Sequence, residues 1–219
     1  SRLRTDHMDL YYLPRVDPEV PIEDTIGAMQ RLVEQGKILN IGICEASAQT
    51  IRRAVKAANV IVVQSEYSLW SRECEREVLP TCRELGIGYV AYSPLGRGFL
   101  TGKIRSESDL EPDDPRHRHP RFQQPNVEKN KPLLEQLDRF AADKGCTPAQ
   151  VALAWLLSRG EDIVPIPGTG NPQRLAENLG ALSVNLTESE QDALSEIFRP
   201  GAFTGDRGPD FDMRYMEMT

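Results

Sequence analysis

The feature of this sequence that most restricts its fold is a repeated alternation between short apolar segments and longer amphipathic ones. Between the apolar segments, apolar residues follow the three-to-four spacing of one helix face, as they do over residues 21–36. Alternation of this kind predicts parallel β/α units, arranged either as an open doubly wound sheet or as a barrel. The expected strands are residues 7–12, 38–43, 59–65, 87–93 and 162–168.

The predicted helices begin and end at residues with known terminal preferences. Pro21 lies in the first turn of the first helix and Gly36 ends it, while Ser47 is expected to cap the second helix. Thr147 and Pro148 are expected to open a helix that runs on through residue 160. Further helices are expected over residues 74–86, 127–145, 172–182 and 188–198. A charged, proline-rich stretch over residues 101–125 is interpreted as a long loop.

Size and charge restrict the class of protein. A chain of 219 residues can form one sizeable domain, and nothing in it predicts a second. The net charge of −7 argues against non-specific binding to nucleic acid or to a membrane surface. There is no apolar run of eighteen residues and no apolar signal core near the start. Four scattered cysteines without a C-x-x-C pair indicate reduced thiols and a cytoplasmic protein.

The stretch RHRHPR, residues 116–121, suggests either a metal site or a basic patch. Two histidines in a loop with no suitable carboxylates are a weak metal signal, and the chain as a whole is acidic. A solvated loop is therefore the favoured interpretation, and no metal site is predicted.

Polar strings follow several of the predicted strands, and their order and spacing carry the strongest functional signal. The clearest are VAYSPLGRGFLTGK and PIPGTGNPQRLAEN, and the others are DLYYL…RVDP, NIGICEAS and VVQSEYSLWSR. Together they resemble the aldo-keto reductase family over essentially the whole chain. That resemblance implies a TIM (β/α)8 barrel that binds a nicotinamide cofactor, usually NADPH, and reduces aldehydes and ketones. It also implies that residues 1–219 form one truncated domain, a partial barrel with about five of the eight parallel β/α units.

The residue chemistry of these strings agrees with a cofactor site at the carboxyl ends of the strands. The amide of Gln64 can pair with a carboxamide, and the ring of Tyr92 can stack on a nicotinamide. The turn after Tyr92 can present backbone N–H groups to a pyrophosphate, and Lys103 adds positive charge. Arg174, one turn into a helix whose N-terminus favours phosphate, can reach a 2′-phosphate or stack on adenine.

Each of these residues also has a plainer structural interpretation when it is taken alone. Gln64 can cap a strand, Tyr92 can be a core residue, and Arg174 with Glu177 can be a surface pair. The ordered set favours the functional interpretation. The predicted residues for binding NADP(H) are Cys44, Glu45, Gln64, Tyr92, Ser93, Pro94, Leu95, Gly96, Lys103, Gly168, Thr169, Gly170, Arg174, Glu177 and Asn178.

Two positions depart from the family's cofactor pattern. Cys44 and Glu45 stand where the resemblance implies a Ser-Asn or Ser-Arg pair, and a thiol is a weaker hydrogen-bonding group than a hydroxyl. Gly170 lacks the small polar or basic side chain that the resemblance implies at its position. Both departures weaken the predicted cofactor site without abolishing it.

The resemblance also implies a set of catalytic residues that this chain lacks. In the family a tyrosine acid is tuned by an aspartate and a lysine, and a histidine orients the substrate. The first three lie on the first three β/α units, and the resemblance aligns this chain from the fourth strand onward. The histidine position is occupied by Pro14, which has no proton to donate. No catalytic residue is therefore predicted, and the chain alone is expected to be inactive.

Three functional alternatives remain open. The chain is the C-terminal part of an NADPH-dependent reductase, a non-catalytic nucleotide-binding or regulatory module related to channel-associated β-subunits, or the product of a decaying gene. An incomplete barrel exposes sheet edges, which predicts low stability and self-association or a partner chain that covers those edges.

Overall fold

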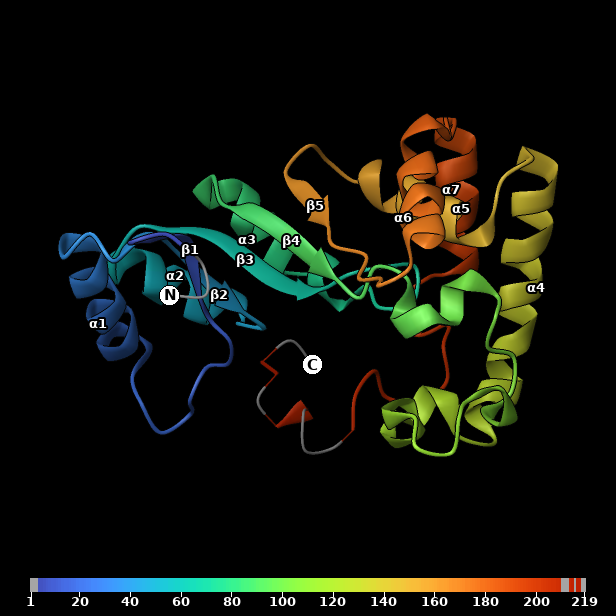
Figure 1. Ribbon diagram of the computed structural model, residues 1–219, viewed down its shortest axis with the longest axis horizontal. Helices are drawn as coiled ribbons and strands as arrows, with labels where there is room; N and C mark the ends of the chain where they lie inside the picture. The colour runs from blue at the N-terminus through green and yellow to red at the C-terminus, as the bar shows by residue number, and fades with distance from the viewer. Residues whose placement is uncertain (1–3, 210–212, 215, 218–219) are drawn as a thin grey trace. The chain divides into compact units, whose positions relative to one another are not determined.

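A computed structural model of the chain describes residues 4–209, 213–214 and 216–217 (Figure 1). Strands and helices alternate through the first part of the chain, and helices dominate the rest. The elements are β1 (Met8–Leu13), α1 (Ile22–Glu34), β2 (Ile38–Cys44), α2 (Ala48–Ala57), β3 (Val60–Glu66), α3 (Val78–Leu85), β4 (Gly88–Tyr92), α4 (Asn126–Lys144), α5 (Pro148–Leu157), β5 (Ile163–Pro165), α6 (Pro172–Leu179) and α7 (Glu188–Ile197).

The five strands belong to one sheet in the order β1-β2-β3-β4-β5, which matches their order along the chain. β1 pairs with β2 in parallel, with Met8 opposite Ile38 and Leu13 opposite Ile43. β2 pairs with β3 in parallel, with Cys44 opposite Gln64. These observations confirm the predicted α/β class and are consistent with a partial barrel.

Several predicted elements differ from those observed, among them α5 and α6, which each end three residues early, and proline explains two of the other differences. The helix expected over residues 74–86 is a short 3-10 helix, Glu73–Glu75, followed by α3, because a continuous helix would place Pro80 in its interior. β5 is shorter than expected because Pro165 and Pro167 have no N–H to donate to a neighbouring strand. The loop over residues 101–125 contains 3-10 helices, which are Glu107–Asp109, Pro115–Arg118 and Pro120–Phe122.

The chain divides into two compact units. Unit 1 comprises residues 1–65, 74–90 and 211–219. Its apolar core includes Ile26, Ile41 and Ile51, all fully buried, and α1 packs beside α2 (Figure 1). α1 ends two residues before Gly36, which has a left-handed φ of 68°, and Ser47 caps α2 by accepting from the Thr50 N–H.

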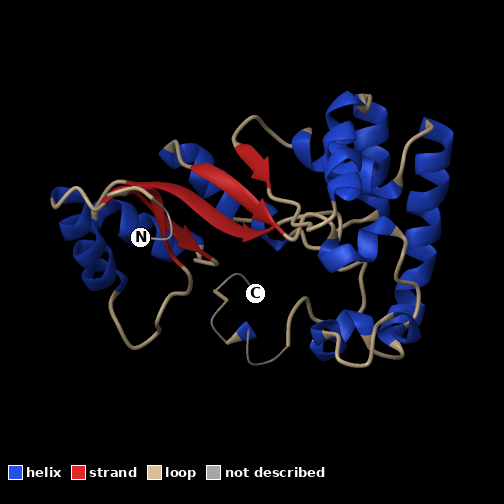
Figure 2. Cartoon of the chain, viewed as in Figure 1, coloured by secondary structure: helices blue, strands red, loops and turns tan. Residues whose placement is uncertain are grey.

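Unit 2 comprises residues 66–73 and 91–210, and helices and loops make up most of it (Figure 2). α5 lies at its centre, with Trp155 fully buried, and contacts α4, α6 and β5. A cluster of aromatic rings forms a second part of the core. Its ring centroids lie 4.5 Å apart for Trp70 and Phe99 and 5.2 Å apart for Trp70 and Phe203.

Within the described residues, no helix is both long enough and apolar enough to cross a membrane. All four cysteines carry free thiols, as predicted.

Candidate cofactor site

A cavity of about 860 Å³ lies within unit 2, formed by two neighbouring segments, residues 92–98 and 101–116, and by a third, residues 166–178, that comes much later in the chain. The turn after β4 forms one wall, residues 166–169 with α6 form a second, and the loop from Thr101 to Arg116 forms a third. The lining residues are Tyr92, Ser93, Pro94, Leu95, Arg97, Gly98, Thr101, Lys103, Ile104, Asp109, Asp114, Pro115, Arg116, Ala149, Ile166, Pro167, Gly168, Thr169, Arg174, Glu177 and Asn178.

Most of the predicted cofactor residues meet at this cavity. Twelve of the fifteen belong to unit 2, and ten of those twelve line it. The two exceptions are Gly96, which is buried against the ring of Trp70, and Gly170, which is exposed. The other three predicted residues, Cys44, Glu45 and Gln64, belong to unit 1.

The turn after β4 has an unusual backbone. Ser93, Gly96, Arg97 and Gly98 all have left-handed φ angles, of 48°, 55°, 54° and 95°. Ser93 and Arg97 carry side chains, so this conformation is unfavourable unless surrounding contacts hold it. Three backbone hydrogen bonds close the turn: the N–H of Gly96 donates to the Ser93 oxygen, and those of Gly98 and Leu100 donate to the Leu95 oxygen.

The second wall is the N-terminus of α6. Asn171 caps this helix, since its side-chain oxygen accepts from the N–H groups of Gln173 (2.9 Å) and Arg174 (3.2 Å), and Pro172 occupies the first helical position. Arg174, Glu177 and Asn178 then line the cavity from the helix itself. The N-terminal end of a helix carries partial positive charge, so it favours an anionic group beside it.

The third wall, the loop from Thr101 to Arg116, contains an ion pair that was not predicted from the sequence. Arg116 binds both carboxylate oxygens of Asp114, at 2.9 Å and 2.6 Å, and its Nη1 donates to the backbone oxygen of Arg97 at 2.9 Å. The hydrogen bonds from Arg116 lower the pKa of Asp114 to about 2, so this carboxylate stays ionised at neutral pH. The only sequence signal for this wall was the charge density of residues 101–125, which does not reveal a partner.

The interpretation of residues 116–121 as a solvated loop is wrong for Arg121. Its side chain is buried, its Nη1 donates to the backbone oxygen of Trp70, and its Nε donates to the backbone oxygen of Gly205 at 2.9 Å. The guanidinium lies over the rings of Trp70 and Phe203, at 5.0 Å and 5.7 Å from their centroids. Burial lowers the pKa of Arg121.

Cationic side chains slightly outnumber acidic ones along the cavity of this acidic chain. Four cationic side chains line it, those of Arg97, Lys103, Arg116 and Arg174, against three acidic ones, Asp109, Asp114 and Glu177. The whole chain carries a net charge of −7. Arg97 pairs with Glu66 and Arg116 pairs with Asp114, so Lys103 and Arg174 are the lining cations best suited to an anionic ligand.

The predicted residues of unit 1 lie at the ends of β2 and β3. Burial is the main cause that raises the pKa of the Cys44 thiol, to about 11, so the thiol is protonated at neutral pH. Glu45 is fully buried with a left-handed φ of 53°, and its N–H donates to the Gln64 oxygen. Gln64 shares a side-chain hydrogen bond with Tyr12, whose ring packs closely against Gly42. Pro14 directly follows β1 and is exposed.

Comparisons with known proteins give the family. The model of the aldo/keto reductase family matches residues 1–199. A probable aldo-keto reductase of Glycine max is 50% identical over 203 residues, a match that covers 90% of this chain and 56% of that protein. This chain belongs to the aldo/keto reductase family.

Solved structures agree. A glycerol dehydrogenase from Gluconobacter oxydans matches with a TM-score of 0.83 and 27% identity over 94% of this chain and 63% of its own. A thermostable aldo-keto reductase solved with the inhibitor epalrestat matches with a TM-score of 0.71 and 30% identity, over 90% of this chain and 62% of its own. The chain therefore spans about three fifths of the length of these relatives.

Proposed function

We propose that this chain binds NADP(H) in the unit 2 cavity. The observation that carries the proposal is that ten of the residues predicted to bind the cofactor line one cavity of suitable size. They come from two stretches of the sequence, residues 92–103 and 168–178. A volume of about 860 Å³ lies in the range of small-molecule and cofactor sites. Membership of a family of oxidoreductases supports the same ligand class.

The residues present fit the chemical groups of this cofactor. The capped N-terminus of α6 and the guanidinium of Arg174 suit a phosphate, and a planar guanidinium also suits an adenine face. Glu177 and Asn178 offer an acceptor and an amide to the adenine edge. The backbone turn of Ser93–Gly98 and Lys103 suit the pyrophosphate, and Tyr92 offers a ring to the nicotinamide. When bound, the reduced cofactor supplies a hydride.

The 219-residue chain by itself is not expected to reduce a carbonyl. Reduction needs a positioned acid that donates a proton to the carbonyl oxygen as the hydride arrives. Pro14, at the position that the family resemblance assigns to a histidine, carries no donor. Pro14 also favours the second candidate function, a non-catalytic module that retains nucleotide recognition. The reductase and the non-catalytic module would both bind the nucleotide in the cavity, but only the reductase would oxidise it while reducing a carbonyl.

Fluorescence titration with NADPH and with NADH tests the binding proposal. Wild-type chain is expected to bind NADPH, and Arg174→Met is expected to weaken NADPH binding about tenfold or more, because it removes a charge-assisted contact to a phosphate. Arg139→Met is the matched control, since Arg139 is 76% exposed on α4 and does not line the cavity. A loss for NADPH that exceeds the loss for NADH places Arg174 at the 2′-phosphate. Absence of NADPH binding by the wild-type chain contradicts the proposal.

Turnover of a test aldehyde separates the two candidates. NADPH oxidation above the buffer rate that is lost on Tyr92→Ala would show that the chain itself is a reductase. Nucleotide binding without such turnover supports the non-catalytic module. Gel filtration of the same samples measures the expected self-association.

A further inference from the structure

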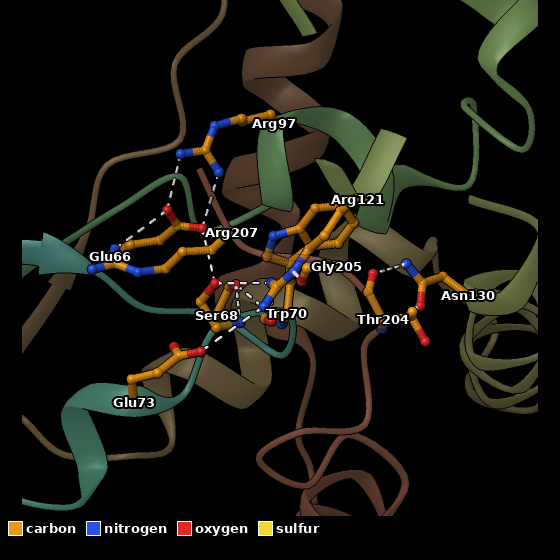
Figure 3. Close-up of polar contacts among 11 residues, drawn as sticks. Glu66, Ser68, Trp70, Glu73, Arg97, Arg121, Asn130, Thr204, Gly205 and Arg207 are labelled. Carbon is orange, nitrogen blue, oxygen red and sulfur yellow. Dashed lines mark hydrogen bonds and ion pairs between the residues drawn. The ribbon is translucent and has the colours of Figure 1, made fainter. Parts of the chain in front are cut away.

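A buried carboxylate that does not line the cavity binds a residue that does. Glu66 is the last residue of β3, and its side chain is fully inaccessible to solvent. Its Oε1 and Oε2 accept from Nη1 and Nη2 of Arg97, at 3.0 Å and 2.9 Å, and its Oε1 also accepts from the Ser71 hydroxyl at 3.0 Å (Figure 3). A two-point pair of this kind fixes both the position and the orientation of the guanidinium.

Arg97 connects this carboxylate to the cavity wall. It lines the cavity, and its backbone lies in the left-handed region, with φ 54° and ψ 29°. A residue with a Cβ leaves that region readily unless contacts over-determine it. Two contacts act on Arg97: Glu66 holds the side chain, and Arg116 donates to the backbone oxygen. The conformation of the turn is thus held by Glu66, which does not line the cavity, and by Arg116, which does.

A second arginine shares the same carboxylate. Nη1 of Arg207 lies 3.7 Å from Glu66 Oε2, and the Arg207 side chain is 3% exposed (Figure 3). The segment that carries it, residues 203–207, is fixed to unit 2 along its length. The N–H of Thr204 donates to the Asn130 amide oxygen at 2.8 Å, and the Gly205 oxygen accepts from Arg121. This segment lies beyond residues 1–199, the part matched by the family model.

We propose that Glu66 and Arg207 are positioning residues for the turn Ser93–Gly98. Through them, the segment of residues 203–207 controls nucleotide affinity at the cavity. Arg97 and Arg207 together balance the buried charge of Glu66 and fix its two oxygens. Loss of Arg207 allows Glu66 Oε2 to shift, and loss of Glu66 removes the anchor of Arg97. In both cases the left-handed turn relaxes. The effect on affinity rests on the proposed function, whereas the effect on the turn does not.

Hydrogen exchange of the ligand-free chain tests the effect on the turn directly. The amides of Gly96, Gly98 and Leu100 donate the three hydrogen bonds that close it, so their exchange rates report its opening. Glu66→Gln and Arg207→Gln are each expected to raise these rates about tenfold, while amides of α1 in unit 1 are unchanged. The control is Lys144→Gln, which breaks a partly buried pair of 2.7 Å with Glu190 elsewhere in unit 2. Unchanged exchange at the turn in the two variants overturns the proposal.

NADPH titration of the same variants supplies the second readout. Glu66→Gln and Arg97→Gln are each expected to raise the Kd about tenfold, and the double variant is expected to be no weaker than the weaker single one, because both break one link. If the double variant instead raises the Kd by the product of the two single effects, Glu66 does not act through Arg97 and the proposal is overturned. Arg207→Lys keeps a cation beside Glu66 and is expected to recover most of the affinity that Arg207→Gln loses. If Arg207→Lys and Arg207→Gln lose NADPH affinity equally, the ion pair between Arg207 and Glu66 does not control that affinity.

The two readouts keep the two proposals apart. If the wild-type chain binds no NADPH, the proposed function fails, while the exchange rates still decide whether Glu66 and Arg207 hold the turn. If Glu66→Gln does not fold, Arg207→Gln and Arg207→Lys supply the same comparison from the other side of the carboxylate. A purely structural role would lower the melting temperature of all variants and leave the Kd of the folded protein unchanged.

Discussion

Gly96 must lack a side chain for two separate reasons, its backbone conformation and its packing against Trp70. Its φ of 55° is left-handed, and a Cβ built on it would lie 3.1–3.3 Å from three atoms of the Trp70 ring. Trp70 is 2% exposed and packs among Phe99, Phe122 and Phe203, so it has little room to move. The turn that faces the cavity therefore depends on glycine for both its backbone conformation and its close approach to the indole ring.

Gly96→Ala is expected to destabilise the chain and to weaken NADPH binding. The left-handed backbone costs about 1–2 kcal/mol for a residue with a Cβ, and overpacking against the ring adds about 1–3 kcal/mol. Gly145→Ala is the matched control, because Gly145 has a similar φ of 67° but no atom lies within 4 Å of the place that a Cβ would occupy there. Urea unfolding measures both variants. Equal losses would show that the ring contact carries no penalty.

Residues at the site divide according to whether their role depends on local sequence. The residues that follow Tyr92 and those around the start of α6 could be predicted, because the order of their motifs resembles the family and the motifs lie at the ends of strands. Arg97, Arg121 and Arg207 could not, because their burial depends on partners far away in the chain. Arg97 pairs with Glu66 across 31 positions and Arg121 binds Gly205 across 84. A charged residue in a polar loop carries no sign of such a partner.

At the scale of elements, one side chain links the central helix of unit 2 to the helix that lines the cavity. Gln150 Oε1 accepts from the Thr147 N–H at 3.0 Å and completes the capping box of α5. Its Nε2 donates to the backbone oxygen of Glu177 on α6, also at 3.0 Å. Thr147 contributes to the capping box alone, since its hydroxyl accepts from the Gln150 N–H.

Gln150→Ala and Thr147→Ala are therefore expected to have similar effects on the free energy of unfolding and different effects on NADPH affinity. Each removes one of the two reciprocal hydrogen bonds of the capping box, and each should lower the free energy of unfolding by about 1 kcal/mol. Gln150→Ala also releases α6, which carries Arg174, Glu177 and Asn178, so its NADPH affinity should fall several-fold while that of Thr147→Ala stays near the wild-type value. Urea unfolding and fluorescence titration give the two quantities. Equal affinities would show that the contact with Glu177 does not position α6.

The elements themselves follow closely from sequence where periodicity and terminal residues agree. The first helix was expected over residues 21–36 and is observed as Ile22–Glu34, because apolar spacing, Pro21 and Gly36 all indicate the same bounds. The prediction was less accurate at α3 and β5, where a proline interrupts an otherwise consistent pattern. Proline overrode the wider pattern at both places because the lost N–H affects backbone pairing directly.

At the scale of the whole molecule, the strand order leaves β1 and β5 at the two ends of the sheet. The relatives that the chain matches are longer, and this chain spans 56–63% of them. Among the described residues, α6 and the turn after it carry an apolar side that is largely exposed. Leu175, Leu179 and Leu182 on α6 and the turn after it are 50%, 57% and 71% exposed, and no residue of α6 is buried. Exposed apolar surface of this extent on a short helix favours association.

The last prediction is that this apolar side drives self-association of the purified chain. Replacement of Leu175, Leu179 and Leu182 by glutamine should shift the chain to the monomer position in gel filtration, because each substitution removes apolar surface that water already reaches. The melting temperature should change little for the same reason. Leu194→Gln is the contrasting control: Leu194 is fully buried on α7, so a polar group there should unfold unit 2. If the wild-type chain is already monomeric and melts cooperatively, the exposed leucines do not drive association, and the expectation of a partner-dependent molecule is wrong.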